Sequence, residues 1–257
     1  MKNASGWLLL LPGLLLANER RFGYSVQTPV LPAGQAEWET SNTLALGPYP
    51  AIYGIQQREE LEVGVGGSTQ ASLYLDLESS TSRVPGGGAS TASQLDGFSV
   101  ELKHSLTDPT ADALGSALYL ELGVRPDELE LEGKILLDKT VGPWAAVANA
   151  IVEGSWGLQA PDGKGASLEF GELPWELDGG LSYRLAPWAS VGAEVRFHEA
   201  VEKEDGQWES RAALFAGPVA TLSSERLWAT LTVLPQLTSE DQSHPSMEVR
   251  LLTGLHI

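Results

Sequence analysis

The chain has 257 residues, no cysteine and a formal net charge of −18. The missing cysteine excludes disulfides, thiolate metal sites and a lipid anchor on cysteine. The acidic balance excludes nucleic acid as a partner, because phosphate contacts need clusters of lysine and arginine. No apolar run reaches the roughly 20 residues of a membrane-spanning helix.

The N-terminus has the pattern of a secretory signal peptide. Lys2 supplies a positive charge, Trp7–Leu16 an apolar core, and Ala17 a suitable residue before the cleavage site. We therefore expect residues 1–17 to be a signal peptide that is removed on export. Residues 18–35 should follow as a short irregular segment on the periplasmic side.

From Ala36 onward, apolar and polar residues alternate in one segment after another. In Leu118–Val124, for example, every second residue is apolar, and Tyr119, Glu121 and Gly123 fall on the opposite face. No segment has a sustained 3.6-residue repeat, so helices are not expected. Twelve segments are predicted to be strands: Ala36–Leu46, Ile55–Val65, Gln70–Glu78, Gly97–Ser105, Leu114–Val124, Glu128–Lys139, Trp144–Trp156, Trp175–Leu185, Trp188–His198, Trp208–Ala216, Leu227–Pro235 and Met247–Ile257.

Most of these segments are about 9–11 residues long, which is the length of a tilted strand crossing a bilayer. Short turns alternate with longer polar connections, such as Ser79–Asp96, which we expect to be an external loop. The sequence therefore predicts an all-β, single-domain transmembrane antiparallel up-and-down β-barrel of about twelve strands over residues 36–257. Its location would be the outer membrane of a Gram-negative bacterium, in contact with lipid.

Tryptophans fall where the two membrane interfaces should lie. Trp144 and Trp156 share one face of one strand, roughly 30 Å apart along the membrane normal. This spacing is typical of the two aromatic girdles of a barrel. The girdle candidates are Trp38, Trp144, Trp156, Trp188 and Trp208, whereas Trp228 has the opposite parity to its neighbours. Core tryptophans of a soluble β-sandwich are the alternative.

The inward faces carry many carboxylates and fewer cations. Rings of Asp and Glu favour cations in a pore. The alternative is a filled interior in which the charges pair with one another. The predicted lumen-lining residues are Glu60, Glu62, Asp76, Glu78, Glu101, Glu121, Glu128, Glu130, Glu132, Glu176, Asp178, Arg184, Glu194, Arg196, Glu248 and Arg250.

Three short motifs are similar to a family of poorly characterised Gram-negative outer-membrane barrel proteins. They are Phe22-Gly23-Tyr24, then Leu31-Pro32-Ala33-Gly34-Gln35-Ala36-Glu37-Trp38-Glu39, and Leu181-Ser182-Tyr183-Arg184-Leu185-Ala186-Pro187-Trp188. The resemblance implies fold and location, but no substrate. The chain departs from the usual aromatic ending of such barrels, because it closes with Leu255-His256-Ile257.

No catalytic, cofactor-binding or metal-binding residue is predicted. His198-Glu199 begins like a zinc-protease helix, but Glu202 stands where the second histidine is needed. The leading hypothesis is a passive channel for small polar or cationic solutes, and not an enzyme. Open alternatives are a non-conducting structural or adhesion barrel, a barrel lipid hydrolase, and a soluble secreted β-protein.

Overall fold

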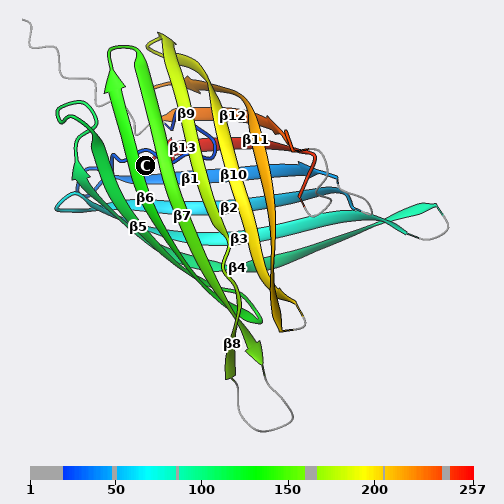
Figure 1. Cartoon of the computed structure of the whole chain (residues 1–257). Coiled ribbons are helices and arrows are strands. Elements are labelled where there is room, and N and C mark those ends of the chain that lie inside the picture. Colours follow the sequence, from blue (N-terminus) through cyan, green and yellow to red (C-terminus); the bar gives the residue numbers. More distant parts are fainter. Residues whose placement is uncertain (1–19, 48–50, 85–86, 160–166, 205, 239–243) are drawn as a thin grey trace, which may run out of the picture.

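The computed structural model describes residues 20–47, 51–84, 87–159, 167–204, 206–238 and 244–257. The predicted signal peptide lies outside these residues. Across the described ranges, every regular element is a β-strand (Figure 1). This part of the chain contains no helix of the length and apolar character that crossing a membrane demands.

Thirteen strands follow one another along the chain. They are β1 (Ala36–Leu46), β2 (Ala51–Gly66), β3 (Thr69–Val84), β4 (Gly88–Thr107), β5 (Gly115–Val124), β6 (Glu128–Val141), β7 (Trp144–Gln159), β8 (Ser167–Glu172), β9 (Trp175–Ala186), β10 (Ala189–Glu204), β11 (Gln207–Ser223), β12 (Leu227–Pro235) and β13 (Met247–His256).

The strands close into one antiparallel barrel. Strands that follow each other in sequence pair, except β8 and β9, and β1 pairs with both β2 and β13, which closes the ring. The short β8 pairs with the end of β7, and β9 then continues along β7 after Pro174. Since β8 and β9 follow each other along β7, the ring has twelve positions. The predicted fold class is confirmed.

The predicted strands are all present. Five of them, β2, β3, β4, β7 and β10, run several residues further than expected toward the long connections. The segment Ser79–Asp96, expected to be a loop, mostly continues β3 and β4 as a paired hairpin beyond the rest of the barrel (Figure 1). This hairpin forms because small polar residues can make the same backbone hydrogen bonds between strands as apolar residues do. Their hydroxyls add contacts between strands, as between Ser79 and Ser93, 2.9 Å apart.

The connection between β4 and β5 is long for its side of the barrel, and hydrogen bonds hold it in a turn. The Asp108 carboxylate accepts from the Thr110 hydroxyl and from the backbone N–H groups of Thr110 and Ala111. These bonds favour the ionised form and hold the pKa of Asp108 below its usual range. The backbone oxygen of Pro109 accepts from Thr140, which fixes the turn to β6.

The outer face of the barrel is apolar. On β5, Leu118, Leu120 and Leu122 are about half exposed, whereas Tyr119 and Glu121 between them are buried. The same alternation runs around the ring, as the side chains of a closed barrel require. Leu120, Leu131 and Val195 would be hidden between the layers of a two-sheet sandwich, but they lie on the outside, 40–52% exposed.

The interior holds the chain's own N-terminal segment. Residues 20–35 were expected only as an irregular stretch on the periplasmic side, but as far as Leu31 they run inside the ring of strands (Figure 1). Phe22 is fully buried and packs with Ala145, Val147 and Val219 of the barrel wall. Tyr24 packs with Phe215 and its neighbours. We call residues 20–35 the plug segment.

Candidate channel interior

Two adjoining cavities, each of about 260 Å³, occupy the barrel next to the plug segment. The first extends from Glu62 and Lys103, near the short turns, to Glu78 and Asp96, near the long hairpins. The second lies against β5, β6, β7, β9 and β10. Residues shared by both are Tyr24, Arg58, Arg125, Lys134 and Arg250. The space inside the barrel is therefore polar, and the plug segment bounds it.

One carboxylate binds the plug segment at three successive backbone groups. Glu194 on β10 accepts hydrogen bonds from the N–H groups of Gly23, Tyr24 and Ser25, at 2.8, 3.0 and 2.9 Å. Thr232 donates its hydroxyl to the same carboxylate, at 2.7 Å. Hydrogen bonds to a buried charged acceptor are among the stronger ones in proteins. Glu194 is therefore the main polar anchor of the segment.

Side chains from other strands form hydrogen bonds with further backbone groups of the plug segment. The Asn149 amide accepts from the N–H of Val26 and donates to its carbonyl, at 2.6 and 2.9 Å. Gln70 accepts from the N–H of Leu31, at 3.0 Å. An irregular backbone inside a barrel needs such partners, because a buried unpaired N–H or carbonyl is costly. The interior residues are thus matched to this segment.

Glycines make room for the plug. A side chain at Gly180 would overlap the Phe22 ring, and one at Gly64 would overlap the backbone of Leu31 and Pro32. These glycines therefore allow a second layer of chain to pass directly against the wall.

Most cations of the interior are paired with carboxylates. Arg58 bridges Asp76 and Glu121, with its nearest contacts at 2.6 and 2.7 Å. Arg196 bridges Glu176 and Glu248, at 2.5 and 3.0 Å. Several cations of the interior also lie over tyrosine rings. The guanidinium of Arg250, for example, lies 3.9 Å from the centre of the Tyr24 ring. Carboxylates still outnumber cations along the two cavities.

The predicted lumen residues fall into two groups. Those that line the cavities are Glu60, Glu62, Asp76, Glu78, Glu101, Glu121, Glu130, Glu132, Glu176, Arg196 and Arg250. Those that do not are Glu128, Asp178, Arg184, Glu194 and Glu248. Of this second group, Glu194 holds the plug and Glu248 pairs with Arg196.

Several interior residues were missed by the sequence reasoning. Arg58 has the same strand parity as Glu60 and Glu62, so alternation alone would have found it. Glu37 and Glu39 on β1 are fully buried as well, and Trp38 between them is exposed. Alternation along β1 would have placed both glutamates inside. Trp228, the tryptophan of opposite parity, lies inside the barrel and donates its indole N–H to Glu37, at 2.8 Å.

The girdle candidates lie on the outer wall. Trp38, Trp144, Trp188 and Trp208 are 46–62% exposed. Trp156 is half-buried and packs against Phe170, which also packs against Trp208. Trp144 contacts the Tyr183 ring edge-on.

Solved structures similar to this chain include outer-membrane channels and porins. The COG4313 outer membrane channel from Pseudomonas putida F1 has 9% identity and a TM-score of 0.69, over 90% of this chain and 98% of that one. The NanC porin has 10% identity and a TM-score of 0.52, over 84% and 97%. The KdgM porin has 7% identity and a TM-score of 0.50, over 85% and 98%. At these identities the likeness shows the fold.

No curated protein sequence matches the chain. A family model described as a family of unknown function, DUF6662, matches residues 15–251. The match spans most of the chain, and the fold is that of outer-membrane channels. The predicted likeness to a poorly characterised family of outer-membrane barrels is thereby confirmed, and the chain belongs to the DUF6662 family.

Proposed function

We propose that this protein is an outer-membrane channel for small polar solutes, closed at rest by its own plug segment. The observation that carries the proposal is a polar space, bounded by residues 20–35, inside a barrel with an apolar exterior. Its wall holds this segment by hydrogen bonds from wall side chains to the segment's backbone and by small apolar clusters around Phe22 and Tyr24. Passage of a solute requires the plug to move.

The lining favours cations in this proposal. Carboxylates are in excess over Lys and Arg along the cavities, and an excess of Asp and Glu along a pore attracts cations and repels anions. The same proposal has three further parts. The signal peptide is cleaved after residue 17 on export, the outer face contacts lipid, and the protein has no enzymatic activity.

Replacing Glu130 and Glu132 by Gln is expected to reduce the cation preference of the open channel. Both line the second cavity, and the change removes two negative charges while keeping shape. Reversal potentials in a salt gradient across a planar bilayer measure the preference, using a chain without residues 20–34 so that the pore is open. The control is the pair Glu169→Gln and Glu209→Gln, which lie outside both cavities. Equal permeability of the unmutated barrel to cations and anions would reject the electrostatic part of the proposal.

A non-conducting barrel is the second candidate, and the well-bonded plug favours it. In that function the extended β3–β4 and β7–β8 strands would bind a partner outside the cell (Figure 1). A barrel without residues 20–34 that still carries no current would support this candidate over the channel.

A further inference from the structure

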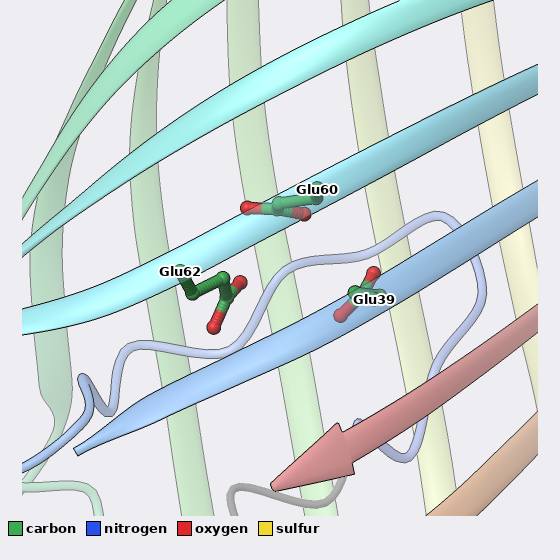
Figure 2. Close-up of side chains that lie close together, drawn as sticks. All are labelled: Glu39, Glu60 and Glu62. Atoms are coloured by element: carbon green, nitrogen blue, oxygen red, sulfur yellow. The ribbon is translucent and has the colours of Figure 1, made fainter. Parts of the chain in front are cut away.

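Three glutamates of β1 and β2 bring their carboxylates together on the inner wall of the barrel. Figure 2 shows Glu39 on one strand and Glu60 and Glu62 on its neighbour, all on the same side. One oxygen from each lies within 4.8 Å of the others. All three residues are buried, at 2%, 4% and 6% exposure.

Each of these carboxylates has an oxygen that is buried and has no hydrogen-bond partner. They are Glu39 Oε2, Glu60 Oε1 and Glu62 Oε2. A neutral side chain nearby is also unsatisfied: Ser72 is 2% exposed, and its hydroxyl has no hydrogen-bond partner. Ser72 is the register partner of Glu62 on β3, with its side chain on the same inner face. Four buried oxygens on one patch of wall therefore lack a hydrogen-bond partner.

The two nearby cations, Arg20 and Lys103, do not balance the charge of the cluster. Arg20 of the plug segment pairs with Oε1 of Glu39, which leaves the other oxygen of that carboxylate open. Lys103 also lines this cavity and interacts first with Glu62 and then with Glu101, a further carboxylate, so two cations face four carboxylates. Buried charges of one sign need a counter-charge or must give up their ionisation. The patch thus retains unpaired acceptors even with Arg20 in place.

From this geometry we propose that Glu39, Glu60 and Glu62 bind one divalent cation of the calcium class, with Ser72 as a fourth oxygen donor. Calcium takes six to eight oxygen ligands at about 2.3–2.6 Å, so opposite ligands lie up to about 5 Å apart, which suits this spacing. Water in the adjoining cavity would complete the shell. The proposal concerns the barrel wall and does not depend on conduction.

Calcium binding to the full folded barrel in detergent, measured by isothermal titration calorimetry at neutral pH, tests the proposal. The unmutated protein is expected to bind one Ca²⁺. Glu60→Gln with Glu62→Gln should weaken that binding by more than roughly 100-fold, since two direct ligands are lost and second-shell changes alone cost 10–100-fold. The matched control, Glu130→Gln with Glu132→Gln, removes the same charge from the other wall and should bind as the unmutated protein does.

A second variant removes Arg20, which competes with calcium for Glu39, and keeps all the proposed ligands. Arg20→Gln should tighten calcium binding several-fold, because Glu39 then loses its bound guanidinium. This variant leaves the wall intact, so it tests the site even if the double variant does not fold. The proposal is overturned if the unmutated protein binds no calcium, if Glu60→Gln with Glu62→Gln binds it equally well, or if Arg20→Gln leaves the affinity unchanged.

Discussion

A barrel lacking residues 20–34 is expected to conduct at least an order of magnitude more current than the full mature chain. The plug segment fills space between the walls through Phe22, Tyr24 and their neighbours. A ring of twelve strands is wider than the eight-stranded barrels that side chains alone can fill. Without the segment, the two cavities and the space it occupied should join into one water-filled path. Single-channel recording in planar bilayers measures the change.

A pair of glycine variants supplies the matched test of the same idea. Gly180 faces inward against the Phe22 ring, whereas Gly179, the residue before it on β9, faces the outside next to Val195. Gly180→Leu should expel the ring, raise the frequency of open events and expose Arg21 to trypsin, while Gly179→Leu should do neither. If deletion of the segment and Gly180→Leu both leave the current unchanged, the plug is not what closes this barrel.

Leu120→Arg is expected to destabilise the barrel in lipid by about 2–4 kcal/mol, the cost of arginine at the bilayer midplane on a barrel's outer face. Leu120 lies in the middle of β5 and is 52% exposed. On a soluble protein an exposed leucine could be replaced by arginine at little cost. The free energy of unfolding, from urea titration of the barrel in lipid vesicles, measures the effect.

The control for Leu120→Arg is Ala92→Arg. Ala92 is exposed on β4 in the hairpin that extends beyond the barrel, where an arginine would meet water. It should change the free energy of unfolding by only a few tenths of a kcal/mol. If the two arginines have the same effect, the outer face of β5 does not contact hydrocarbon.

The barrel itself was predictable because the same alternation of outward apolar and inward polar residues repeats along each strand of its wall. Alternation along each strand places Leu120 outside and Glu121 inside, and this needs no knowledge of distant residues. β1 and β12 have the predicted bounds. β8 was missed, since it is only six residues long and Pro174 ends the region soon after it.

The plug was not predictable from local pattern, because its partners lie far along the chain. Glu194 is separated from Gly23 by 171 positions, and Asn149 from Val26 by 123. The segment has no repeat of its own, and its backbone is satisfied by single side chains of the wall. A carboxylate that holds three backbone N–H groups looks, in sequence, the same as any other inward-facing glutamate. For this reason Glu194 was predicted as a lumen residue without its role.

Contact between lipid and the outer face of the barrel can be tested directly by spin-label accessibility. Because the chain has no cysteine, single labels can be placed by Leu120→Cys, Leu131→Cys and Val195→Cys, with Ala92→Cys as the control. In vesicles, the first three labels should collide with oxygen and be shielded from a water-soluble nickel complex, and the control label should show the reverse. Immobile labels at Leu120, Leu131 and Val195 that neither reagent reaches would mean that these residues are packed inside the protein.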